Sequence, residues 1–170
     1  MIDVLIIDDN SKDGTAGIVK DYIKQFPDRI YIEERSGKLG LGTAYIHGFK
    51  WALNNGYEFI FEMDCDFSHN PDDLIRLFKA CATPAELKAE KLDETEAGNG
   101  DMSIGSRYIN GVNVVNWPMS RVLMSYFAGF YVRFITGMKV QDATAGFVCY
   151  RRNTLETLPL VQIKFIGLWI

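Results

Sequence analysis

Residues 59–73, FIFEMDCDFSHNPDD, restrict the possible folds of this chain more than any other stretch. The stretch opens with three apolar residues, a pattern typical of a buried strand. Asp64 and Asp66 follow, with one residue between them, and Asn70 then stands before a proline as a helix N-cap. This order predicts a strand, a loop with two carboxylates and a helix, as at the ligand-binding edge of an open α/β sheet.

The two carboxylates of this loop would repel each other unless a cation lay between them. Mg²⁺ or Mn²⁺ is commonly held by one or two carboxylates together with the phosphates of a substrate. A D-x-D motif is short, however, and a solvated acidic loop in which Asp66 caps a helix would show the same letters. Asp64 and Asp66 are therefore candidate metal ligands, with a plain acidic loop as the alternative.

Length and composition narrow the class of protein. The chain has 170 residues, enough for one domain with a core, and its 48% apolar content excludes disorder. A net charge of −4 argues against a general nucleic-acid binder. Three widely spaced cysteines favour free thiols in a reducing compartment. The chain opens with no signal-peptide pattern, and its longest apolar run, residues 122–132, is too short to span a bilayer.

Polar motifs also follow other predicted strands. The apolar run 4–7 ends in Asp8 and Asp9, which could accept hydrogen bonds from a ribose or a base edge, or form only a turn. A predicted strand at 102–105 leads to Arg107, which could bind phosphate through its planar fork or form a surface salt bridge. The loop GKLGLG at 37–42 fits neither the P-loop nor the dinucleotide fingerprint.

The remaining pattern predicts the architecture. Strands alternating with helices indicate an α/β protein with a mostly parallel sheet and helices on both faces. We expect one domain over residues 1–170, with 83–100 as a polar, partly helical surface excursion. A long amphipathic helix from Met119 to about Thr136 carries a dense aromatic face. That face could pack in the core or lie at a membrane interface.

Six segments match, in chain order, the motifs of one known family. They are VLIIDDNSKDGT at 4–15, GKLGLGTAYIHGFKWA at 37–52, MDCDFSHNP at 63–71, IGSRY at 104–108, VNWPMSR at 115–121 and QDATAGFVCYRR at 141–152. Through them the chain resembles the family 2 glycosyltransferases with the GT-A fold, in particular the dolichol- or polyprenol-phosphate mannosyltransferases (the dolichyl-phosphate mannose synthase type). The longer segments are far more specific than D-x-D alone.

The resemblance implies a glycosyltransferase that moves mannose from GDP-mannose to a polyprenyl (dolichyl) monophosphate, with inversion and with Mg²⁺ or Mn²⁺. The positions it assigns to the sugar nucleotide are Ile7 (through its backbone), Asp9, Asp64, Cys65, Asp66 and Arg107. Among these, Asp64 and Asp66 are expected to hold the metal, and Asp66 and Arg107 to be catalytic. Arg121 and Ser125 lie where the lipid phosphate is expected.

The acceptor implied by the resemblance is a phosphate, which is already ionised at neutral pH, so no strong general base is required. Positioning two anions is the harder task, and a metal with arginines addresses it. Asp142 is then expected to be structural or to support other site residues rather than to act as a base. A lipid acceptor also implies a membrane surface as partner, hence a peripheral protein at the cytoplasmic face of a membrane.

The chain departs from the family pattern at both ends. The family usually begins with an extra central strand and continues past KFIG at 164–167 into a further basic segment. We therefore expect a partial domain that lacks the first strand, truncated at both ends. Two alternatives stay open: another sugar-nucleotide donor, or a non-catalytic remnant that binds a nucleotide. An unpaired sheet edge would also favour association of the chain into a homo-oligomer.

Overall fold

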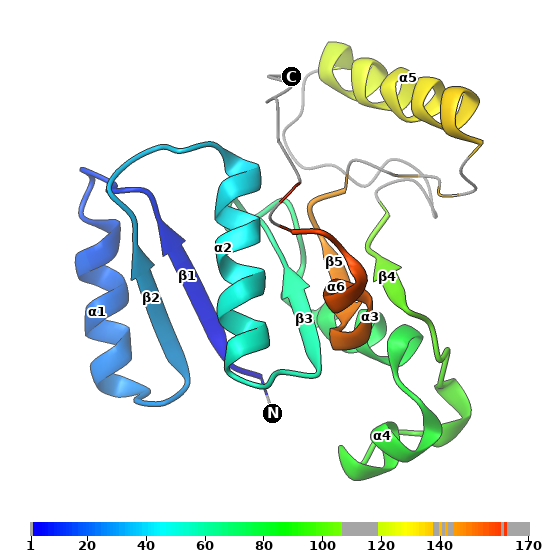
Figure 1. Ribbon diagram of the computed structural model, residues 1–170, viewed down its shortest axis with the longest axis horizontal. Coiled ribbons are helices and arrows are strands. Elements are labelled where there is room, and N and C mark those ends of the chain that lie inside the picture. The colour runs from blue at the N-terminus through cyan, green and yellow to red at the C-terminus, as the bar shows by residue number, and fades with distance from the viewer. Residues whose placement is uncertain are drawn as a thin grey trace. The chain divides into compact units, whose positions relative to one another are not determined.

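A computed structural model describes residues 2–106, 119–137, 140, 142, 145–160 and 162 (Figure 1). The contacts between residues divide the chain into two compact units, each of which is described by itself. The first contains Met1–Tyr57 and Leu155–Ile170, and the second contains Glu58–Thr154.

The first unit is built on two parallel strands. Strand β1, Val4–Asp8, pairs with β2, Ile30–Glu34, so that Ile6 lies opposite Ile32. Parallel neighbours need a crossover, and α1, Thr15–Gln25, supplies it and packs against both strands. Helix α2, Leu41–Asn54, packs against β1, and its Trp51 stacks on Tyr57 with ring centroids 5.7 Å apart. The strand predicted at residues 4–7 is confirmed.

The second unit holds a three-stranded sheet in the order β3–β5–β4 (Figure 1). Strand β5, Val148–Arg151, lies between β3, Phe59–Glu62, and β4, Met102–Ile104, and runs antiparallel to both. The α/β class is thus confirmed, whereas the sheet of this unit is not mostly parallel. Ile104 pairs with Val148, so the chain leaves β4 and returns to β5 at the same edge of the sheet. Such a return gives an antiparallel neighbour, because a parallel one requires the connection to cross the length of the sheet.

One helical segment covers this sheet. The side chain of Asn70 accepts a hydrogen bond from Asp72 N (3.1 Å) and begins η1, Pro71–Asp73, which confirms the predicted N-cap. The chain continues as α3, Leu74–Cys81, which packs against β4 and β5. Their common core consists of Leu77, Cys81, Phe147 and Cys149.

Residues 83–100 contain α4, Pro84–Ala89, and η2, Glu94–Glu96. Thr83 and Glu86 form a capping box at the start of α4, and Leu87 is fully buried. Arg151 of β5 donates to both carboxylate oxygens of Glu86, at 2.7 and 3.2 Å. The acid-rich segment is therefore anchored to the sheet through Glu86.

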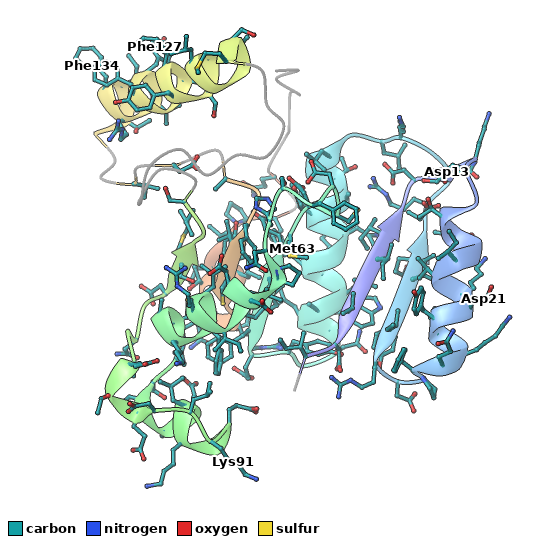
Figure 2. All side chains as sticks on the ribbon, turned by 180° about the vertical axis from the view of Figure 1, so that it is seen from behind. Asp13, Asp21, Met63, Lys91, Phe127 and Phe134 are labelled. Carbon is teal, nitrogen blue, oxygen red and sulfur yellow. The ribbon has the colours of Figure 1, made fainter. Side chains whose placement is uncertain are left out.

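Helix α5, Met119–Thr136, exposes most of its apolar side chains. Phe127 and Phe134, one heptad apart, project from it in Figure 2 and are 62% and 77% exposed. The apolar residues exposed on this helix are Met119, Leu123, Met124, Tyr126, Phe127, Phe130, Tyr131, Phe134 and Ile135. Within the described residues, none of the helices has the length and hydrophobicity needed to cross a bilayer. The last helix, α6, is Arg152–Thr157.

Candidate functional site

Three of the motif segments meet at one edge of the sheet in the second unit. Glu62, at the end of β3, and Ile104, at the end of β4, both pair with Val148, the first residue of β5. The chain just beyond β3 carries Asp64 and Asp66, and the chain just before β5 carries Gly146 and Phe147. Strand pairing, rather than nearness in sequence, brings these residues together.

The loop after β3 is tightly turned around Asp66. The carboxylate of Asp66 accepts a hydrogen bond from Ser68 N (3.0 Å), and hydrogen bonds from Ser68 hold its pKa below the ordinary value of 3.8. Phe67, between them, has a φ of 63° although it is a bulky aromatic residue, and it is 94% exposed. Left-handed backbone costs energy for a bulky residue, and strained residues of this kind are enriched at functional sites. Asp66 thus stays exposed on a loop that is held in a strained shape.

Asp64 faces a buried imidazole. Its Oδ2 lies 3.7 Å from Nε2 of His69, and the two side chains are 44% and 8% exposed, respectively. The His69 ring stacks on Phe147, with ring centroids 5.0 Å apart and an interplanar angle of 28°. Cys65, between the two aspartates, is an exposed free thiol. The predicted pair Asp64 and Asp66 is therefore positioned by a structured loop with protein partners.

Glu62 is a titratable group at this edge that the sequence analysis did not single out. Burial raises its pKa to about 7, the negative charge of Asp64 adds to the rise, and a hydrogen bond from Tyr150 Oη (3.2 Å) opposes it. The same burial and the nearby Glu62 carboxyl raise the pKa of Tyr150. The sequence signal was a carboxylate that ends an apolar strand, two residues before Asp64.

The strand-end acids of the first unit have different surroundings. Asp8 is 4% exposed and accepts a hydrogen bond from Ser11 N (3.0 Å), so hydrogen bonds from Ser11 lower its pKa. Asp9 forms a bidentate ion pair with Arg35, at 2.5 Å from Nε and 2.7 Å from Nη2. Nη1 of Arg35 also donates to Thr43 (2.7 Å). Sequence analysis missed Arg35, which precedes the glycine-rich loop and carried no motif of its own.

The other predicted site residues are placed only in part. Ile7 lies within β1, opposite Glu33 of β2. Ser125 lies on α5, whereas Arg107 and the side chain of Arg121 are outside the described residues. Asp142, predicted to be structural, is 2% exposed. The structure thus brings Asp64 and Asp66 into one loop and places Asp9 in the other unit.

The donor set beside β3 suits a hard divalent cation. Among the residues that the structure describes, no three His, Cys, Asp or Glu side chains form a cluster that could hold a metal. Asp66 is exposed and Asp64 is partly exposed, so both carboxylates are accessible to an ion that takes its other ligands from phosphates and water. Mg²⁺ and Mn²⁺ are typically bound in this way, through one or two carboxylates and a substrate. The residues present therefore fit such an ion.

The comparisons with known proteins agree on one family. The model of glycosyl transferase family 2 matches residues 1–158. The chain is 41% identical over 166 residues to the polyprenol monophosphomannose synthase of Mycolicibacterium smegmatis, covering 98% of this chain and 57% of that protein. It is 38% identical over 165 residues to the undecaprenyl-phosphate mannosyltransferase of Micrococcus luteus, covering 97% of this chain and 61% of that protein.

The chain therefore spans about three fifths of the length of these two curated relatives. The search of solved structures gave no match. The family match extends over nearly all of the chain and includes both loops with strand-end carboxylates. This chain belongs to glycosyl transferase family 2.

Proposed function

We propose that the protein transfers mannose from GDP-mannose to a polyprenyl monophosphate. The observation that carries this proposal is the loop after β3, which presents Asp64 and Asp66 in a fixed, accessible arrangement. The names of the two relatives add the sugar and the class of acceptor, since one is a polyprenol monophosphomannose synthase and the other an undecaprenyl-phosphate mannosyltransferase. The family supplies the reaction class, transfer of a glycosyl group.

The proposed reaction is a single displacement at the anomeric carbon. An oxygen of the acceptor phosphate forms the new bond to this carbon, the bond to the GDP oxygen breaks, and GDP leaves with the electron pair. Attack from the opposite face inverts the configuration. The acceptor oxygen is already ionised, so no protein base has to remove a proton, and alignment of the two anions dominates the barrier.

Separate sets of residues are assigned to the donor and to the acceptor. Asp64 and Asp66 would hold Mg²⁺ or Mn²⁺ against the diphosphate, and such an ion stabilises the charge that develops on a departing diphosphate. The backbone of Ile7 and the side chain of Asp9 are assigned to the nucleoside, with Cys65 beside the diphosphate. Arg107 is assigned to the donor phosphates.

The acceptor is assigned to helix α5, where Arg121 and Ser125 would bind the lipid phosphate. The same helix exposes the aromatic side chains of Phe127 and Phe134, which suit the boundary of a lipid layer (Figure 2). We therefore place the protein peripherally at the cytoplasmic face of a membrane. Co-sedimentation with anionic lipid vesicles tests this: Phe127→Glu with Phe134→Glu should abolish vesicle binding. Phe67→Glu, at an even more exposed aromatic residue outside α5, should not.

A donor panel tests the reaction itself. The full chain is incubated with a polyprenyl phosphate and, in separate reactions, GDP-mannose, GDP-glucose, UDP-glucose and UDP-N-acetylglucosamine, with Mn²⁺ or with EDTA. We expect mannosyl transfer from GDP-mannose that stops in EDTA. Transfer from another donor would replace mannose in the proposal. Transfer that persists in EDTA would show that the reaction does not require a metal.

A binding measurement separates an enzyme from a remnant. A ligand that binds only the folded state raises the thermal unfolding midpoint. We expect GDP-mannose to raise the midpoint of this chain, and to raise it more with Mn²⁺. A metal-independent rise without any transfer would support a non-catalytic nucleotide-binding protein instead.

A further inference from the structure

Beside Asp64, the described structure leaves one buried polar atom unsatisfied. The imidazole of His69 is 8% exposed, and its Nε2 has no hydrogen-bond partner among the described residues. A buried N–H without a partner costs about 1–3 kcal/mol, so such atoms are rare in folded proteins. The polar atom that Nε2 faces is Asp64 Oδ2, at 3.7 Å, which is longer than a hydrogen bond but within the distance of an ion pair.

Packing fixes the plane of the His69 ring. One face stacks on Phe147, which is 3% exposed. Phe147 is itself locked by Gly105, whose N donates to Phe147 O at 2.8 Å. A Cβ added at Gly105 would lie 2.7 Å from the Phe147 ring, so a larger residue at this position would displace the ring. His69 can therefore shift little to find another partner.

The Asp64 carboxylate is confined from a second side by Gly146. A Cβ added at Gly146 would lie 2.7 Å from Asp64 Oδ2 and 3.4 Å from Oδ1. The same oxygen, Oδ2, is thus the one that faces the imidazole and the one that lies closest to this glycine. Two segments far apart in the chain, 64–69 and 146–147, together set the orientation of one carboxylate.

We infer that His69 is the positioning residue of Asp64: its imidazole, held on Phe147, directs Nε2–H toward Oδ2 and holds the carboxylate against Gly146. The donor role follows from the geometry, because a lone pair on Nε2 would point at a carboxylate oxygen and be repelled. The inference rests on the proposed function, in which Asp64 binds the cation and the diphosphate. Outer partners of this kind orient metal ligands, and their loss typically weakens metal binding about 10- to 100-fold.

Binding of Mn²⁺ in the presence of GDP tests the positioning role. The signal of free Mn²⁺ in electron paramagnetic resonance reports the affinity without any need for turnover. His69→Phe keeps a ring on Phe147 but removes the N–H, and we expect it to weaken Mn²⁺ binding about tenfold. His69→Gln places an amide N–H near the position of Nε2 and should restore the affinity to within about threefold of wild type.

A matched control and a second variant make this test specific to the contact between His69 and Asp64. The chain has two histidines, and His47 lies on α2, 43% exposed and 3.1 Å from Glu33, so His47→Gln should leave Mn²⁺ binding unchanged. Gly146→Ala displaces Asp64 from the other side and should weaken binding with His69 intact. Wild-type affinity in both His69→Phe and Gly146→Ala would overturn the inference.

Nuclear magnetic resonance distinguishes failure of the His69 inference from failure of the proposed function, because it detects the His69–Asp64 contact without metal or nucleotide. In the His47→Gln background, the remaining imidazole should carry its proton on Nε2, and the resonance of that proton should move upfield in Asp64→Ala. A proton on Nδ1 alone, or a resonance indifferent to Asp64, would overturn the inference. If instead wild type fails to bind Mn²⁺ with GDP while the resonance depends on Asp64, the proposed function fails and the contact stands.

Discussion

The ends of β1 and β3 look alike in the sequence and differ in their electrostatics. Both are apolar strands that run into acidic residues and then a turn. At the end of β1, Arg35 neutralises Asp9 and Ser11 caps Asp8, so the protein itself stabilises both charges. At the end of β3, burial and the charge of Asp64 raise the pKa of Glu62 to about 7, and Asp66 stays exposed.

This difference distinguishes two carboxylates that the protein itself stabilises from a strand end where burial destabilises the charge of one carboxyl group, Glu62. Carboxyl groups that a fold leaves crowded are a common property of binding and catalytic sites, because the missing stabilisation comes from the substrate or an ion. At the end of β3, Glu62 has this property, because burial raises its pKa to about 7, whereas Ser11 and Arg35 stabilise the two carboxylates at the end of β1. Matched substitutions at the two strand ends test whether the difference holds.

The largest effect is expected for Asp66→Asn. The exposed carboxylate contributes little to folding, yet the proposed function places it on the cation. We expect mannosyl transfer to fall at least about a hundredfold while the unfolding midpoint changes little. Asp72→Asn, an exposed acid in the next helical turn, is the control. Equal activity of the two variants would contradict the assignment of Asp66.

Arg35→Met should show the opposite profile, a loss of stability. The guanidinium is 8% exposed and the Asp9 carboxylate 24%, so the substitution leaves a largely buried carboxylate without its partner. We expect the free energy of unfolding to fall by about 3 kcal/mol, measured from urea midpoints. Lys24→Met breaks an ion pair that is exposed on both sides, and should destabilise the protein much less than Arg35→Met does. Similar losses for both would show that the Asp9–Arg35 pair is as weak as a surface pair.

The two strand ends also show how much of the site the sequence could reveal. Sequence analysis predicted the strands before Asp8 and Asp64, the Asn70 cap and the two D-x-D carboxylates, because these depend on local patterns of apolar and turn-forming residues. It missed Arg35, Glu62 and His69, whose roles depend on which residues lie across from them. It also missed the antiparallel direction of β5, because alternation of strands and helices does not show to which edge a long connection returns.

Glu62→Gln should stabilise the protein at alkaline pH. Because the folded-state pKa of Glu62 is raised from 4.5 to about 7, the folded state keeps this proton longer than the unfolded state does. The contribution of Glu62 to stability is therefore fully present below pH 4.5 and is lost as the pH rises through about 7. Glutamine can retain the hydrogen bond from Tyr150 without a charge, and should add about 2 kcal/mol at about pH 8 and almost nothing at about pH 4. Urea unfolding at both pH values measures the difference, and a gain independent of pH would contradict burial of the charge as its cause.

The smallest effect, and the opposite sign, is expected for Asp8→Asn. The pKa of Asp8 is lowered from 3.8 by hydrogen bonds from Ser11, so its ionised form favours the folded state. This contribution is complete above pH 3.8 and disappears as the pH falls through the lowered pKa. Asp8→Asn should thus be slightly less stable than wild type at about pH 7 and equally stable near about pH 2, as thermal midpoints would show. A deficit that persists in acid would mean that the side-chain volume, rather than the charge, matters at this position.

The central position of β5 has a consequence for how the chain acquires its structure during synthesis. β1 and β2 pair after a single helix has formed between them, so the first unit can begin to fold from contacts close in sequence. Among the described strands, β3 and β4 pair only with β5, which follows both of them in the chain and leaves the ribosome after them. Pairing across long stretches of chain is slow, and unpaired strand edges promote aggregation in the meantime. The segment that carries Asp64 and Asp66 thus acquires its sheet partner late in folding, only when residues 148–151 arrive.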